Sequence, residues 1–202
     1  ITSTITTADA NMGILTLAGG TQIVTGQVGT NGNKLAEVNA GVAGSSTTFV
    51  NDVYATNLDV EGTGTVNLDG KFTGTAVRYN ADGTVILADT KNIDSSVTTT
   101  TNNTGTLSLE GSSTVTGQVG ASGASLKEIN AGVAGTTSTF NSNVYASNLN
   151  MTGAGTVVLN SDLTGNVVTT GNNQGILTTT GVNQTITGNI GSSTSLDLNT
   201  LN

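Results

Sequence analysis

The stretch GQVGTNGNKLAEVNAGVAG, residues 26–44, is written a second time as GQVGASGASLKEINAGVAG, residues 117–135. The two stretches share all their glycine positions, and their apolar residues fall at matching places. A catalytic site is needed once in a protein, whereas a stacked scaffold uses the same building block many times. The duplication therefore indicates a repeat architecture.

The similarity extends well beyond these two stretches. Residues 13–74 align with residues 105–165 when Gly20 is left unmatched. Matching positions include Phe49 with Phe140 and Tyr54 with Tyr145. We divide the chain into a first unit of approximately residues 5–96, a second unit of approximately residues 97–166, and a partial third unit, residues 167–202.

A shorter motif recurs inside these units. Segments such as GILTL, GTVNL and GTLSL begin at Gly13, Gly64, Gly83, Gly105, Gly155 and Gly175. The closely spaced copies follow one another at a nearly constant interval, which is typical of a solenoid. Residues 75–95 have no counterpart in the second unit, although the sequence on both sides aligns. A stack of coils tolerates such a change, because each coil contacts only its neighbours.

The motif predicts short β-strands in which alternate side chains face inward. Val66 and Leu68 form the inward pair of GTVNL, and Leu107 and Leu109 form that of GTLSL. The chain has no proline, as expected where every strand donates to a ladder. We predict an all-β fold, a parallel right-handed β-helix of about nine or ten coils of roughly 20 residues, with residues 1–202 as one segment. A β-sandwich is the alternative, but it does not explain the clean absence of a counterpart to residues 75–95.

Composition excludes several classes of function. The 13 acidic and 5 basic residues give a net charge of −8, which does not suit a nucleic-acid surface. The chain has no Cys and no His, so triads that use these residues, disulfides and imidazole or thiolate metal sites are impossible. No apolar run is long enough for a spanning helix. We predict no enzyme activity, no catalytic or metal-binding residues, no cofactor and no small-molecule substrate.

The remaining candidates for chemistry are carboxylates. Asp59 and Glu61 lie two residues apart and would share one face of a strand, as an acid/base pair or a cation site does. Their counterparts in the second unit are Asn150 and Thr152, so a solvated outer face is the favoured interpretation. A second acidic group lies within residues 75–95, which we call the extra coil. It comprises Asp82, Asp89 and Asp94 and lies beside two bases, Lys91 and Arg78.

Two further patterns have simple structural interpretations. NADG, residues 80–83, lacks the spacing of a calcium loop and predicts a turn with left-handed residues. Thr-x-Thr pairs could form a flat ice-binding array if they were stacked one coil apart. They occur at Thr4/Thr6, Thr98/Thr100, Thr114/Thr116, Thr178/Thr180 and Thr185/Thr187, and these spacings do not give one row.

The combination of these segments resembles a known family. LKEINAGVAG, residues 126–135, and GTVILADTKNIDSSVTTTTNNTGTLSLEGSSTVTGQVG, residues 83–120, resemble the passenger regions of rickettsial surface cell antigens, autotransporters of the outer membrane protein A and B type. The resemblance covers nearly the whole chain. It implies an internal piece of a longer passenger that is exported to the bacterial surface and anchored by a C-terminal β-barrel translocator elsewhere in the parent chain.

The resemblance implies a structural and adhesive surface module. Its expected partners are a host-cell surface protein or glycan and the parent chain's own translocator. Two alternatives remain open, a carbohydrate-active enzyme built on a β-helix and a spacer stalk that contacts nothing. An absence of disulfides suits a chain that crosses the periplasm unfolded and then folds coil by coil.

Overall fold

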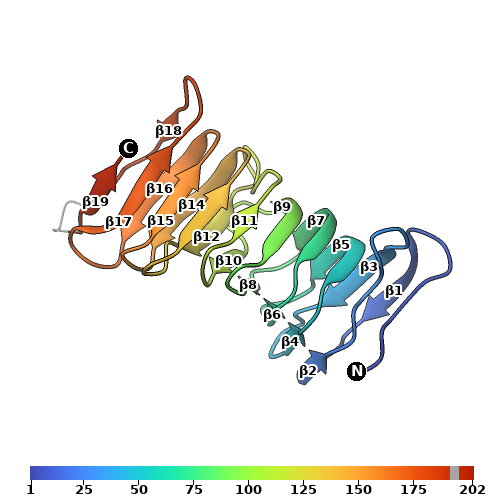
Figure 1. Cartoon of the computed structure of the whole chain (residues 1–202). Helices are drawn as coiled ribbons and strands as arrows, with labels where there is room; N and C mark the ends of the chain where they lie inside the picture. Colours follow the sequence, from blue (N-terminus) through green and yellow to red (C-terminus); the bar gives the residue numbers. More distant parts are fainter. Residues whose placement is uncertain (192–195) are drawn as a thin grey trace.

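Parallel strands wound into a rod make up the described structure (Figure 1). The computed structural model describes residues 1–191 and 196–202, and within these residues the fold is all-β with no helix. It follows that no described segment is a helix long and apolar enough to cross a membrane. The strands are β1 (Met12–Thr16), β2 (Thr21–Val24), β3 (Leu35–Ala40), β4 (Ser46–Phe49), β5 (Val53–Val60), β6 (Thr65–Leu68), β7 (Phe72–Tyr79), β8 (Thr84–Leu87), β9 (Asn92–Thr99), β10 (Thr106–Leu109), β11 (Thr114–Val115), β12 (Leu126–Ala131), β13 (Thr137–Phe140), β14 (Val144–Met151), β15 (Thr156–Leu159), β16 (Leu163–Thr169), β17 (Gln174–Thr179), β18 (Ile186–Thr187) and β19 (Leu198–Leu201).

Each turn of the rod places one strand beside its equivalent in the next turn. Val53 pairs with Phe72, and Phe72 pairs with Ile93, so about 20 residues complete a turn. Odd-numbered strands form one parallel sheet and even-numbered strands form the other. The chain is therefore a β-solenoid of about nine turns, which confirms the fold class predicted from the repeats.

Side chains that alternate inward along the strands fill the rod. Val66, Leu68, Leu107 and Leu109 are all buried, as predicted. Inward residues stack along the axis, and one such stack comprises Val38, Leu58, Val77, Val97, Val119 and Val144. Because burial of each side chain requires the turn above and the turn below, the core is continuous through the stack.

Residues 75–95 form one circuit of the solenoid. Ala76 lies in register with Ser96, one turn later, and the segment contains β8 and parts of β7 and β9. The sequence prediction of an extra coil is therefore confirmed. The flanking strands keep their parallel register, because a whole turn can be added without changing how its neighbours pair.

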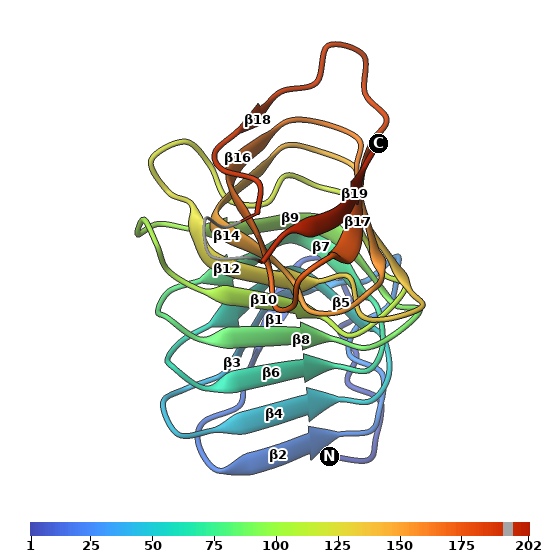
Figure 2. The same ribbon diagram turned by 90° about the vertical axis from the view of Figure 1, so that its left-hand side faces the viewer.

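Equivalent strands of the two large units lie on different faces of the rod. β3 and its sequence counterpart β12 lie in opposite sheets, and so do β4 and its counterpart β13. The exchange occurs because the offset between the units is not a whole number of turns: Val38 shares its stack with Val119 and Val144 rather than with its counterpart Ile129. Figure 2 shows β2, β4, β6, β8 and β10 as one ladder that continues into β12, β14 and β16. Strands of closely similar sequence therefore lie on two different faces of the rod.

Tyr79, which the extra coil contributes, is fully buried in the core. Its hydroxyl donates a hydrogen bond of 2.6 Å to the carbonyl of Thr106, so the polar atom is satisfied. Gly105 packs on the ring: a Cβ there would lie 2.5 Å from Tyr79 Cγ, and its φ is +87°. Burial raises the pKa of Tyr79 far above its ordinary value.

The prediction of left-handed residues in NADG is wrong. None of residues 80–83 has a positive φ. Gly83 is required for another reason, namely that a Cβ would lie 2.4 Å from the carbonyl oxygen of Gly62 in the turn below. Close approach of neighbouring turns, rather than backbone handedness, fixes this glycine.

Gly105→Ala should destabilise the solenoid more than Gly135→Ala does. Both glycines have positive φ. Each substitution therefore costs about 1–2 kcal/mol of backbone strain. Of the two, only Gly105 faces an aromatic ring, and overpacking there should add about 1–3 kcal/mol. Denaturant unfolding of the two variants measures the difference. Equal unfolding midpoints would show that the Tyr79 ring moves aside at no cost in stability and would contradict the prediction.

Alkaline pH should weaken the fold through Tyr79. Since its pKa is raised in the folded state, its stabilising contribution is complete below the unfolded pKa of about 10 and decreases as pH rises above it. The expected loss is about 1.4 kcal/mol per pH unit. Above that pH, the free energy of unfolding should fall less steeply with rising pH in Tyr79→Phe than in the unaltered protein. The surface change Tyr145→Phe serves as the control. Identical slopes in all three proteins would contradict this role.

Candidate functional site: the outer faces of the solenoid

The prediction of a solvated outer face for Asp59 is wrong. Asp59 points outward from β5, yet it is only 3% exposed. Arg78, its register partner on β7, covers the carboxylate and donates to it from both Nε (2.5 Å) and Nη2. The pair is thus a two-pronged guanidinium–carboxylate contact on the wall of the rod.

Arg78 also contacts the turn beyond Asp59. Its Nη2 lies 3.2 Å from Glu37 Oε2 on β3, so one guanidinium joins carboxylates from two preceding turns. Hydrogen bonding to Asp59 raises the pKa of Arg78, and the negative charges of Asp59 and Glu37 add to the effect. Both acids are therefore paired with the same base, and neither carboxylate is left without a partner for acid/base catalysis.

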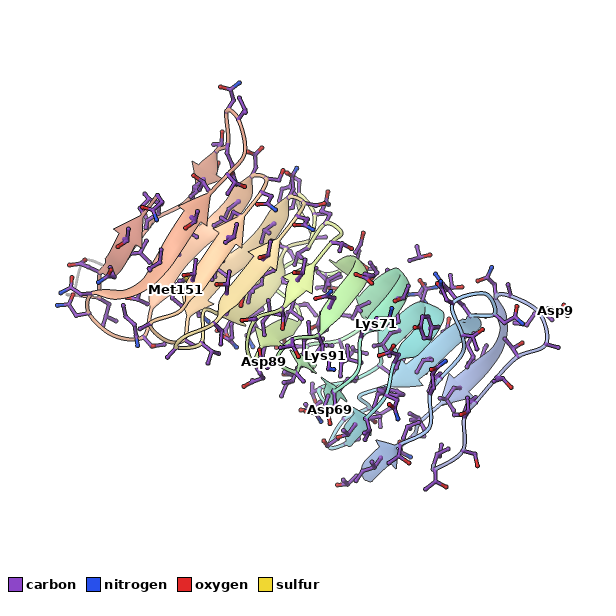
Figure 3. All side chains as sticks on the ribbon, viewed as in Figure 1. Asp9, Asp69, Lys71, Asp89, Lys91 and Met151 are labelled. Carbon is purple, nitrogen blue, oxygen red and sulfur yellow. The ribbon has the colours of Figure 1, made fainter. Side chains whose placement is uncertain are left out.

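The other acidic candidates do not come together. Glu61 is exposed and accepts a hydrogen bond of 3.0 Å from the amide of Asn80. Asp89 accepts one of 2.7 Å from the backbone N–H of Ser112. Across residues 1–191 and 196–202, no three acidic side chains are placed to hold a metal ion. Asp9 lies at one end of the rod, far from Asp69 and Asp89 (Figure 3).

The rest of the acidic group in the extra coil is also dispersed. Asp94 lies on β9, in register with Thr73 of β7. Lys91 lies in the turn before β9, where its backbone N–H donates a hydrogen bond of 3.3 Å to the carbonyl of Ala88. The acids and bases that the sequence places in one coil therefore do not form one cluster, and Arg78 instead contacts Asp59 and Glu37 of the preceding turns.

Asp82 links the two large units. It accepts a hydrogen bond of 2.8 Å from Lys127 Nζ and one of 3.1 Å from the backbone N–H of Gly105. The hydrogen bond from Lys127 lowers the pKa of Asp82. Both side chains are nearly half exposed, so this ion pair contributes little to stability.

Two tyrosines are the aromatic side chains on the outer surface. Tyr54 and its counterpart Tyr145 are half-buried, whereas the three phenylalanines and Tyr79 are buried. Lys71 Nζ lies 5.3 Å from the centre of the Tyr54 ring. That separation is within range of a cation–π contact. Because the offset between the units is not a whole number of turns, the equivalent rings belong to different sheets, Tyr54 to that of β5 and Tyr145 to that of β14.

The Thr-x-Thr pairs of the sequence do not form a row of threonines. Thr98 lies in register with Arg78, and Thr178 lies in register with Val158. The neighbours of these threonines in the adjacent turn therefore carry no hydroxyl. Thr114 and Thr187 each lie in register with one threonine, Thr139 and Thr164. The next residues in these two rows are Val158 and Tyr145, so neither row extends into an ice-binding array, as the spacing indicated.

Sequence reasoning missed a different row of hydroxyls on the even-numbered strands. Its members lie in register from one turn to the next and are Thr21, Ser46, Thr65, Thr84 and Thr106. Asn67 donates to Ser46 Oγ and Thr48 Oγ1, so the hydroxyls near it bond within the wall. The signal was present in the sequence as the threonine that follows glycine in GTVNL, GTVIL and GTLSL.

Comparisons with known proteins give no match to any protein-family model, curated protein or solved structure.

Replacing Arg78 should cost more than replacing Arg78 and Asp59 together. Asn150, the counterpart of Asp59, lies in register with Val168 of the partial third unit, which shows that a neutral pair fits this wall. Arg78→Val leaves the buried carboxylate of Asp59 without its partner and should lower the free energy of unfolding by about 3 kcal/mol. Adding Asp59→Asn should restore most of that stability. A double variant no more stable than the single one, measured by denaturant unfolding, would refute the charge explanation.

Proposed function

We propose that the chain is a structural and adhesive module of a bacterial surface protein, a rigid rod that contributes to attachment to host cells. The observation that carries the proposal is the continuous core with outer walls of short, mostly uncharged polar side chains. Such a rod projects contact area away from an anchor without a catalytic centre. The resemblance to autotransporter passengers supports the same role.

The hydrogen bonds that the carboxylates already make favour this function over a carbohydrate-active enzyme. Glycoside hydrolysis needs two carboxyl groups on opposite sides of the scissile bond. Asp59 is instead covered by Arg78, and Glu61 bonds to Asn80. The surface offers the two equivalent tyrosines as the best contact residues, because half-buried tyrosines are rigid and amphipathic.

The proposal predicts that beads coated with this protein attach to cultured mammalian cells more than beads coated with an unrelated β-helix of similar charge. Tyr54→Ser with Tyr145→Ser should lower attachment more than Thr65→Ser with Thr156→Ser, a matched pair of changes with one on each sheet. Circular dichroism verifies that all variants fold. Attachment equal to that of the unrelated β-helix would overturn the adhesive role and leave a spacer.

A further inference from the structure

The loop at residues 30–33 differs from its counterpart at residues 121–124. In the second unit, Ala121 and Ala124 exchange two backbone hydrogen bonds, 2.9 and 3.0 Å long, that close a two-residue turn. In the first unit, Thr30 N donates to the carbonyl of Asn33, but Asn33 N donates to the side-chain oxygen of Thr30 instead. The first loop therefore has one backbone hydrogen bond where the second has two.

Residues 31 and 32 lie at the tip of the more open loop. Asn31 and Gly32 are both exposed, and the backbone N–H of Gly32 donates none of the hydrogen bonds found among the described residues. A Cβ built at Gly32 would have no atom within 4 Å. The loop is anchored on either side, since Asn33 Nδ2 donates to the carbonyl of Ala8 and Asn11 N donates to that of Lys34.

We propose that Asn31–Gly32 is a site of spontaneous self-modification. The backbone nitrogen of Gly32 attacks Cγ of Asn31 and forms a C–N bond. The Cγ–Nδ2 bond breaks, and Nδ2 leaves as ammonia with the proton that the Gly32 amide gives up. Water then opens the resulting five-membered succinimide at either carbonyl, which yields aspartate or isoaspartate, and no oxidant or cofactor is involved.

Several features of this position favour the reaction. The attacking amide is not held by a hydrogen bond to the described residues, and the absence of a side chain at residue 32 leaves its approach unhindered. Asparagines in the walls differ, because their side chains bond along the ladder, as Asn150 does to Asn130 and Asn160 does to Asn141. The sequence has no other Asn-Gly pair.

The modification would make the two large units unequal. Ser122 occupies the position of Asn31 in the second unit and cannot react in this way. Conversion of Asn31 adds one negative charge to the net charge of −8 and places a carboxylate shortly before Lys34 in the chain. The isoaspartate product also lengthens the backbone of the exposed loop by one carbon.

The test is incubation of the folded protein at neutral and mildly alkaline pH, followed by peptide mass spectrometry of the aspartate and isoaspartate products. Asn31 should convert over time, faster at higher pH, while the hydrogen-bonded wall asparagines remain amides. Gly32→Ala should slow the conversion several-fold without unfolding the loop, because its Cβ meets open space. Persistence of the Asn31 amide, or conversion of the wall asparagines at the same rate, would overturn the proposal.

A matched variant separates the effect of structure from that of sequence. Ser122→Asn places the same dipeptide in the closed loop before Gly123. In the folded protein this loop should convert several-fold more slowly than Asn31, and in denaturant the two rates should become similar. Equal rates in the folded protein would show that the open loop has no influence and would refute the structural basis of the site.

Discussion

The parallel backbone ladder between neighbouring turns is the constraint on which the rest of this structure depends. It sets a repeat of about 20 residues and fixes which side chains face the axis. Inward residues such as Leu58 and Val77 are buried only because the adjacent turns cover them. A change that preserves the ladder is tolerated, whereas a change that prevents two turns from approaching is not.

The exchange of faces between equivalent strands of the two units follows from that constraint. A turn must match only its neighbours, so a unit that begins part of the way round the rod pairs as well as one that begins in phase. β10 shows this directly, because it pairs with β8 on one side and with β12 on the other. A closely similar sequence therefore presents Tyr54 and Tyr145 on different sheets while the core stays continuous.

Polar side chains on the walls also depend on their neighbours in adjacent turns. Asn130 accepts from Asn150 and donates to Ser108, so this outward row is neutral and bonded from turn to turn. In the first unit the position equivalent to Asn150 holds Asp59, which requires Arg78 from the extra coil. The extra coil is thus coupled to the rest of the rod by charge as well as by the buried ring of Tyr79.

Strand alternation and turn spacing are local properties, so the repeat length, the inward residues and the extra coil could all be predicted from the amino-acid sequence. It also excluded any site built on cysteine or histidine. The environment of Asp59, the partner of the Tyr79 hydroxyl and the sheet to which each of two equivalent strands belongs depend on how the turns stack. The first two features join residues that are far apart in the chain and meet only through stacking of turns. Small differences in turn length accumulate along the stack, and the phase between units therefore emerges only when all the turns are wound together.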